Sequence, residues 1–263
     1  MKNPGNWNIT NAEVIAQWSA HAQESVSDFG EEGDLVRQRL LNPALLALLG
    51  DVRGRKVLDA GCGNGYLARL LARNGAIVTG VEPALYRLAM EREQVMPVGI
   101  VYLAEDLSLL LSRLPHLSDA FDTVVCNLVL QDIPDCDAAI ANCLGCLRPG
   151  GNFVFSILHP CFEDTSSTWA ANGYVSTAEY FEHRKVPQRR FGCFFHRPLS
   201  YYLNAVAGSG GHIRRVVEPQ LPADFPSAGT AFEREKYIPS FVVVQATRDA
   251  QECFLVDTGS DPP

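Results

Sequence analysis

The stretch Val57–Leu71, VLDAGCGNGYLARLL, decides how the rest of the chain is interpreted. A short apolar run leads into glycines at positions 61, 63 and 65, and a helical pattern of leucines follows. Glycine permits a tight turn and lets a ligand approach the backbone, because it has no Cβ. The start of a helix adds free amide groups. The stretch therefore predicts a strand, a nucleotide-binding glycine loop and a helix.

The spacing of these glycines argues against a dinucleotide site. In the G-x-G-x-x-G pattern the third glycine comes three positions after the second, whereas Gly65 follows Gly63 by two. The lysine and hydroxyl residue of a P-loop are also missing. An NAD-dependent reductase is therefore disfavoured.

Apolar runs alternate with helical patterns on both sides of the glycine loop. The expected strands are residues 56–60, 76–82, 99–106, 121–130, 151–158, 212–219 and 240–248. Strands that are apolar throughout, with helices between them, indicate a mostly parallel sheet buried on both faces. The prediction is an α/β fold with a doubly wound, seven-stranded sheet, whose ligand lies at the carboxyl ends of the strands.

The chain divides into five expected segments. N-terminal helices, the first with Asn11 as its N-cap, form a cap over residues 1–50, and the α/β core follows over residues 51–158. Residues 159–197 interrupt the alternation and are rich in aromatic side chains, which predicts a lid or substrate insertion. A C-terminal helix and the last two strands occupy residues 198–250, and residues 251–263 are an expected frayed tail.

Composition narrows the class of protein. The formal net charge of −8 disfavours a nucleic-acid partner, and the basic stretch at residues 183–190 is interpreted as a solvated loop. There is no signal-peptide pattern and no apolar run long enough to span a membrane, so a cytoplasmic location is expected. The eight cysteines are expected to be reduced. Cys143 and Cys146 fit a helical core face better than a metal site, and no metal is predicted.

Acidic side chains follow three of the expected strands. Asp59 ends the first strand, Glu82 the second, and Asp106 follows the third. Carboxyl ends of parallel strands share one edge of a sheet, so these acids are expected to gather there. A carboxylate at Asp59 repels a pyrophosphate and suits an ammonium or sulfonium group. Together the acids favour a cationic nucleoside as the ligand.

Several motifs in order resemble the class I S-adenosylmethionine-dependent methyltransferases. They are VLDAGCGNG at residues 57–65, Glu82, AEDL at 104–107, FDTVVCNLVLQDIPD at 121–135 and LRPGG at 147–151. The likeness covers roughly residues 57–158 and is greatest to the ubiquinone/menaquinone-type and small-molecule branches. It implies a Rossmann-like methyltransferase fold and S-adenosylmethionine as cofactor, with S-adenosylhomocysteine as product.

The resemblance also implies roles for individual residues. It places Asp59, Gly61, Cys62 and Gly63 along the methionine part of the cofactor, Glu82 at the ribose, Asp106 and Leu107 at the adenine, and Asn127 at the methionine end through its backbone. The competing, structural interpretation of Asp59 and Glu82 is that they cap a loop or a helix.

The residues that handle the methyl acceptor are less constrained. Candidates for catalysis are His159, after the fifth strand, His196, before the next helix, and Gln131, where related chains often carry a histidine. Candidates for acceptor contact are Trp18, Trp169, Tyr201 and Tyr202. For either histidine a structural role is the competing interpretation.

Methyl transfer is an in-line displacement, so alignment matters most, and a base is needed only for a protonated nucleophile. The aromatic side chains favour a small aromatic or heteroaromatic acceptor, such as a natural product, methylated on oxygen or nitrogen. Alternatives are an RNA or protein methyltransferase and a non-catalytic cofactor-binding protein. The sequence leaves the acceptor and the oligomeric state open.

Overall fold

A seven-stranded sheet forms the centre of the computed structural model, which describes residues 7–22, 33–95, 97–162, 173–187, 193–226 and 232–249. Its strands are β1 (Lys56–Ala60), β2 (Ile77–Val81), β3 (Val101–Leu103), β4 (Phe121–Asn127), β5 (Leu147–Leu158), β8 (Gly211–Val217) and β9 (Phe241–Arg248). Their order across the sheet is β3-β2-β1-β4-β5-β9-β8. The first five run parallel, whereas β9 lies antiparallel between β5 and β8. The predicted doubly wound, mostly parallel sheet is thus confirmed.

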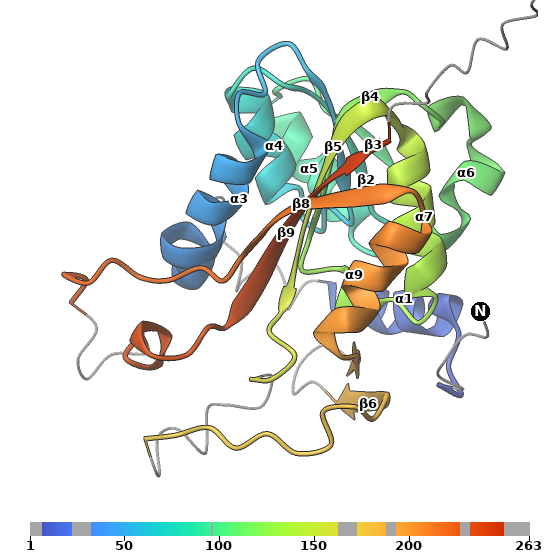
Figure 1. Ribbon diagram of the computed structural model, residues 1–263. Coiled ribbons are helices and arrows are strands. Elements are labelled where there is room, and N and C mark those ends of the chain that lie inside the picture. The colour runs from blue at the N-terminus through green and yellow to red at the C-terminus, as the bar shows by residue number, and fades with distance from the viewer. Residues whose placement is uncertain are drawn as a thin grey trace, which may run out of the picture.

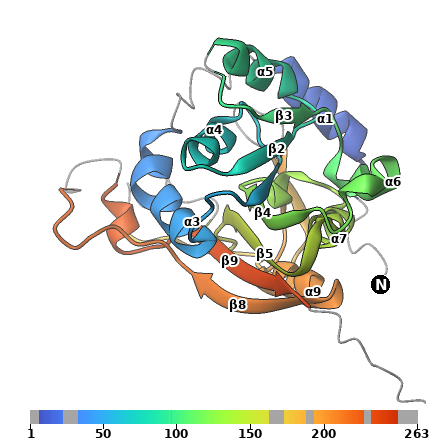
Figure 2. The same cartoon turned by 90° about the horizontal axis from the view of Figure 1, so that it is seen from above.

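Helices cover both faces of this sheet (Figure 1). One side carries α3 (Asn42–Leu49), α4 (Tyr66–Arg73) and α5 (Tyr86–Val95), and the other carries α6 (Leu110–Arg113), α7 (Cys136–Cys146) and α9 (Leu199–Gly208). Figure 2 shows the same layers from above. The short helical turns are η1 (Arg37–Leu41), η2 (Leu107–Leu109), η3 (Pro115–Leu117), η4 (Leu130–Asp132) and η5 (Arg234–Lys236).

The side chains of each central strand alternate between two hydrophobic cores. On β4, Val124 and Cys126 join the core beneath α7 and α9, while Val125 joins the core beneath α3 and α4. Successive side chains of a strand point to opposite faces. Both faces of β4 are therefore buried, as the unbroken apolar pattern predicts. Cys143 and Cys146 are fully buried on α7, within the first of these cores.

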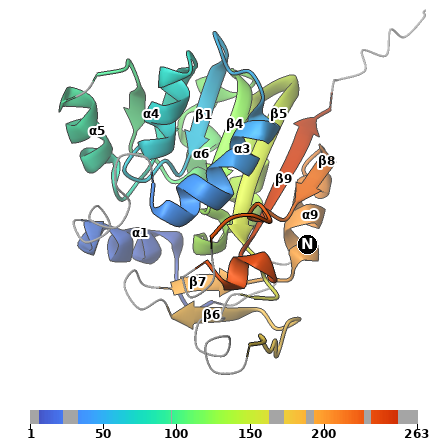
Figure 3. The same cartoon turned by 90° about the vertical axis from the view of Figure 1, so that its left-hand side faces the viewer.

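Two further elements lie at the carboxyl edge of the parallel strands. They are α1 (Asn11–Ala20) and a hairpin of β6 (Arg184–Pro187) with β7 (Cys193–His196). Figure 3 shows both at the same end of the molecule, below the sheet. Part of the predicted insertion, including Trp169, and the predicted tail at residues 251–263 lie outside the described residues.

The N-cap of α1 differs from the sequence-based expectation. Thr10 caps the helix, and its side chain accepts a hydrogen bond from the Glu13 backbone while the Glu13 carboxylate accepts one from the Thr10 backbone. This reciprocal capping box satisfies two helix-end amides, and it leaves the side chain of Asn11 for contacts elsewhere. Placing the cap at Asn11 was wrong by one residue. Within the described ranges, no helix is long and apolar enough to cross a membrane.

Candidate active site

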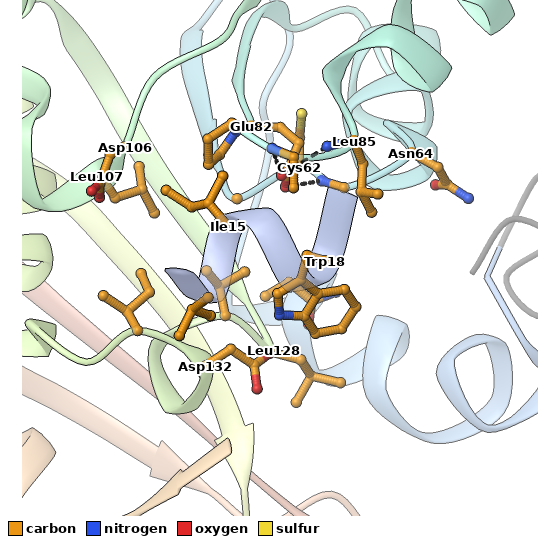
Figure 4. A pocket seen from close by; sticks show the side chains of 18 of the residues that line it. Ile15, Trp18, Cys62, Asn64, Glu82, Leu85, Asp106, Leu107, Leu128 and Asp132 are labelled. Atoms are coloured by element: carbon orange, nitrogen blue, oxygen red, sulfur yellow. Dashed lines mark hydrogen bonds between the residues drawn. The ribbon is translucent and has the colours of Figure 1, made fainter. Parts of the chain in front are cut away.

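One cavity opens where β1, β2 and β4 end, and α1 lies across it (Figure 4). We call it the strand-edge cavity. The lining residues that the sequence predicted are Trp18, Gly61, Cys62, Gly63, Glu82, Asp106, Leu107 and Asn127. The lining residues that it did not predict are Asn11, Val14, Ile15, Arg37, Asn64, Tyr66, Pro83, Ala84, Leu85, Leu128, Val129, Asp132, Ile133 and Pro134. The expected gathering of strand-end residues is thus present in the fold.

The glycine loop needs its glycines for two separate reasons. Gly61 has a φ of 79°, in the left-handed region, and a Cβ there would lie 2.5 Å from the Val129 side chain. Gly63 is also left-handed, with a φ of 56°, but a Cβ there would meet no atom closer than 4.0 Å, on Leu85. The loop is therefore pressed against the segment after β4 at Gly61 and faces open space at Gly63. That open space belongs to the cavity.

Glu82 ties the end of β2 to the glycine loop. Its Oε2 accepts a hydrogen bond from the Gly63 backbone at 3.0 Å, and its Oε1 accepts from Ala84 at 2.8 Å and Leu85 at 3.1 Å. Burial raises the pKa of this carboxyl, and these amides oppose the rise. Glu82 thus does cap a loop, and it also lines the cavity, so the two interpretations of this acid are compatible.

Asp59 lies near the end of β1, just before the same loop, is 1% exposed and is not among the residues that line the cavity. Among the described residues, its Oδ2 has no hydrogen-bond partner. Burial, followed by the nearby charge of Glu82, raises the pKa of this carboxyl to about 7. A buried carboxyl with an unsatisfied oxygen favours a cationic or hydrogen-bond-donating ligand.

These features fit an adenosyl ligand with a positive charge. Asp59 and Glu82 place acidic groups around the glycine loop, and Gly63 leaves room for a ligand against the backbone. Asp106 supplies a third carboxylate along the same cavity. A sulfonium and an ammonium group offset the mutual repulsion of such acids, whereas a pyrophosphate increases it.

Asp106 caps the turn η2 and also contacts α1. Its Oδ1 accepts hydrogen bonds of 2.9 Å from the backbone and hydroxyl of Ser108, and the Asn11 side-chain amide lies 3.3 Å from its Oδ2. Leu107 is buried beside it. The adenine end that the resemblance implies is therefore closed by the first residue of α1, which the sequence did not indicate.

Asn127 is half-buried and belongs to a chain of hydrogen-bonded polar side chains. Its Nδ2 donates to the Tyr66 hydroxyl at 2.7 Å, and its Oδ1 accepts from the Ser156 hydroxyl at 2.6 Å. Ser156 in turn accepts from the Leu128 backbone at 3.0 Å, and Leu128 is a non-glycine residue with a φ of 57°. Such a conformation is sparsely populated and persists where neighbouring contacts hold it. The hydrogen bonds thus fix a bend in the cavity wall after β4.

The predicted catalytic histidines are not among the residues that line the strand-edge cavity. The Nε2 of His159 lies 2.8 Å from Glu218, and its Nδ1 accepts a hydrogen bond from Cys161. The Nε2 of His196 lies 2.9 Å from the carbonyl oxygen of Tyr180, and the ring is fully buried. Both positions favour the structural interpretation, and the catalytic role stays an untested prediction.

Of the remaining candidates for contact with the methyl acceptor, some line the cavity and others do not. Gln131 is 4% exposed on η4 and does not line the cavity, whereas its neighbour Asp132 does. Tyr202 lies in the core beneath α7 and α9, and Tyr201 packs against Arg197, outside the cavity. Trp18 alone of the described candidates lines the cavity, where Figure 4 shows its indole on α1.

Comparison with known proteins agrees with the geometry. A methyltransferase domain family matches residues 58–155. The ubiquinone biosynthesis O-methyltransferase of Coxiella burnetii (strain Dugway 5J108-111) is 32% identical over 177 residues, which cover 65% of this chain and 72% of that protein. The protein of the same name from Escherichia coli O127:H6 is 31% identical over 164 residues, covering 60% of this chain and 65% of that protein.

Solved structures extend the likeness to the fold. A crystal structure of an S-adenosylmethionine-dependent methyltransferase from Mesorhizobium loti has a TM-score of 0.61 at 28% identity, covering 78% of this chain and 96% of that one. The 1,6-didemethyltoxoflavin-N1-methyltransferase of Burkholderia thailandensis, solved with S-adenosylhomocysteine, shares the fold at 18% identity, with a TM-score of 0.60 and 92% and 91% of the two chains covered. With these matches and the sheet order, the chain belongs to the class I S-adenosylmethionine-dependent methyltransferases and uses S-adenosylmethionine as its cofactor.

Proposed function

We propose that this methyltransferase acts on an oxygen or nitrogen atom of a small aromatic or heteroaromatic metabolite. The observation that carries the proposal is the apolar lining of the cavity on α1 and on the segment after β4. Val14, Ile15 and Trp18 line it from α1, and Leu128, Val129, Ile133 and Pro134 line it from the other segment. A flat apolar molecule fits such a lining, because aromatic surfaces stack on an indole.

The acidic half of the cavity is proposed to hold the cofactor. Glu82 is assigned to the ribose hydroxyls and Asp106 to the adenine amino group, while Asp59, Gly61, Cys62, Gly63 and the backbone of Asn127 are assigned to the methionine end. When bound, S-adenosylmethionine supplies an electrophilic methyl group on a sulfonium centre. The apolar lining would exclude water and hold the acceptor with its nucleophilic atom toward that methyl group.

The experiment that tests the acceptor class uses S-adenosylmethionine labelled on its methyl group. The protein is incubated with the labelled cofactor and an extract of its own cells, which is then separated into metabolites, RNA and protein. Label in one small aromatic or heteroaromatic product supports the proposal. Label that stays with RNA or protein overturns it, and so does label in a purely aliphatic product.

A matched variant shows whether the cavity is the site of binding. Glu82→Gln keeps the size of the side chain but weakens its capacity to accept hydrogen bonds from ribose. Its affinity for S-adenosylhomocysteine is expected to fall by about 1–3 kcal/mol, measured by calorimetry. Glu105→Gln makes the same chemical change at a carboxylate that pairs with Arg113 and does not line the cavity. It serves as the control, and equal affinities of both variants and the wild type would remove Glu82 from the site.

A further inference from the structure

Asn11 joins the first turn of α1 to two loops that are far away in the sequence. Its Nδ2 donates a hydrogen bond of 2.6 Å to the Ser108 hydroxyl, and its Oδ1 accepts one of 3.1 Å from the Asp135 backbone. Ser108 follows β3, and Asp135 immediately precedes α7. One amide side chain therefore bridges the loop at the proposed adenine end and the loop that carries the apolar lining.

The helix attached in this way covers the strand-edge cavity. Val14, Ile15 and Trp18, which follow Asn11 on α1, all line it. In Figure 4 the Ile15 and Trp18 side chains lie between Glu82 on one side and Leu128 and Asp132 on the other. A ligand that fills this cavity is thus covered by α1 on one side.

A second cavity, of about 860 Å³, lies on the other side of the start of α1. Both cavities are lined by Asn11, Ile15, Pro83, Asp106 and Pro134. The start of α1 and the loops that Asn11 bridges therefore form the partition between the two spaces. Asn11 is thus one of the residues that separate the proposed adenine end from the second cavity.

The distances around Asn11 leave Asp106 available to a ligand. The short contact of Nδ2 is to Ser108, whereas its contacts to the Asp106 oxygens are longer, at 3.3 and 3.4 Å. Asp106 Oδ2 thus retains acceptor capacity. The bridge from Asn11 to Ser108 and Asp135 is compatible with a nucleoside amino group at Asp106.

We propose that Asn11 is a positioning residue that latches α1 over the bound cofactor and so sets the rate at which the cofactor leaves. The proposal rests on the cofactor site assigned above. Asn11 acts through Ser108 and the Asp135 backbone, without taking part in methyl transfer. Release of S-adenosylhomocysteine requires that these two hydrogen bonds break, and they form again when the next cofactor is enclosed.

Dissociation of labelled S-adenosylhomocysteine from the full chain tests the latch. Asn11→Ala is expected to raise the dissociation rate about five- to thirty-fold, as two hydrogen bonds of ordinary strength are lost, with the association rate unchanged or higher. Ser19→Ala is the matched control, because its hydroxyl bonds only to the exposed backbone of the same helix. The wild-type rate in Asn11→Ala, or an equal rise in Ser19→Ala, overturns the proposal.

Two further variants separate a latch from a general loss of structure. In the double variant Asn11→Ala with Ser108→Ala, the increase in the dissociation rate should be smaller than the product of the two single increases, since either change alone already breaks the hydrogen bond between the two side chains. Asn11→Asp places a second carboxylate beside Asp106 and removes the donor to Ser108. Protonation at lower pH restores a donor, so the rate at which S-adenosylhomocysteine dissociates from this variant, relative to wild type, should fall as the pH is lowered. An increase equal to that product, or a relative rate that does not change with pH, contradicts the latch.

The same measurements distinguish failure of the latch from failure of the assigned site. If Glu82→Gln weakens binding while Asn11→Ala leaves dissociation unchanged, the site stands and the latch is wrong. If neither variant changes binding, the cofactor does not occupy the strand-edge cavity and both proposals fail. Thermal unfolding of each ligand-free variant confirms that the chain is folded in the binding experiments.

Discussion

Gly61 and Val129 touch so closely that no side chain fits between them. A Cβ on Gly61 would lie 2.5 Å from one methyl carbon of Val129 and 2.6 Å from the other, below any normal contact distance. Gly61 belongs to the loop after β1, and Val129 to the segment after β4, so this contact joins the two strand ends that flank the cavity. The glycine that the sequence marks as a ligand-approach position is also a packing position.

Gly61→Ala should therefore destabilise the protein through overpacking and through its φ of 79°. The expected loss is about 1–3 kcal/mol from overpacking alone, measured by urea unfolding, and S-adenosylhomocysteine affinity should fall with it. Gly63→Ala is the matched comparison, because it shares the left-handed backbone but a Cβ there would meet no atom closer than 4.0 Å. A greater loss of stability in Gly63→Ala than in Gly61→Ala would contradict the packing explanation.

The raised pKa of Asp59 predicts how ligand-free stability depends on pH. A carboxyl whose folded pKa is about 7, above its ordinary value of 3.8, binds its proton more tightly in the folded state. Its contribution to stability is complete below the ordinary value and is lost as pH rises through about 7. Asp59→Asn should therefore flatten the dependence of the melting temperature between about pH 5 and 8. A slope equal to that of the wild type would show that Asp59 does not titrate in this range.

Cofactor binding should have the opposite pH dependence. A cationic ligand stabilises the carboxylate forms of Asp59 and Glu82, so binding near neutral pH should release protons. The affinity for S-adenosylmethionine is then expected to fall as pH is lowered from about 8 to 6. Calorimetry in buffers of different ionisation enthalpy measures the released protons. Binding without proton release in the wild type would contradict this prediction, and loss of the release in Asp59→Asn would assign it.

Arg197 should support the wall of the cavity from behind. Its guanidinium is 1% exposed and donates hydrogen bonds of 2.8 Å to the carbonyls of Ile133 and Pro134. It also packs on the ring of Trp7, with 5.1 Å between the guanidinium carbon and the ring centroid. Arg197→Met leaves two buried carbonyls unsatisfied, and a loss of about 2–4 kcal/mol in unfolding free energy is expected. Arg214→Met, at an exposed arginine of β8, is the control and should change stability by less than about 0.5 kcal/mol.

His159→Gln should lower stability without affecting the cofactor. One ring nitrogen contacts Glu218 and the other accepts from the Cys161 backbone, so the substitution disturbs the connection after β5. A loss of about 1–2 kcal/mol is expected in urea unfolding, with S-adenosylhomocysteine affinity within about twofold of wild type. Unchanged stability together with loss of the acidic limb of the pH–rate profile, where the rate rises as a base loses its proton, would restore the predicted role as a base.

The sequence by itself determined the sheet, the glycine loop and the acids at its edge. These features follow from local patterns, because short apolar runs form strands. Parallel strands then bring their carboxyl ends to one edge of the sheet, whatever the path of the loops between them. The methyltransferase motifs at residues 57–65 and 121–135 lie in the same local segments. Glu82 and Asn127 thus line one cavity, and the buried Asp59 lies at the end of the strand between theirs, as the order of the strands requires.

Only the tertiary structure decided what covers that edge. The Asn11 side chain forms hydrogen bonds with Ser108, 97 positions away in the sequence, and with the Asp135 backbone, 124 positions away. Hydrophobic periodicity in the sequence does not indicate such contacts. The two histidines also show that the sequence does not predict the direction of a side chain. His159 and His196 are close in sequence to the expected acceptor site, yet their rings are turned to Glu218 and to the Tyr180 carbonyl. The direction of a side chain depends on which partners the folded chain brings to it, and those partners come from segments that the local sequence does not specify.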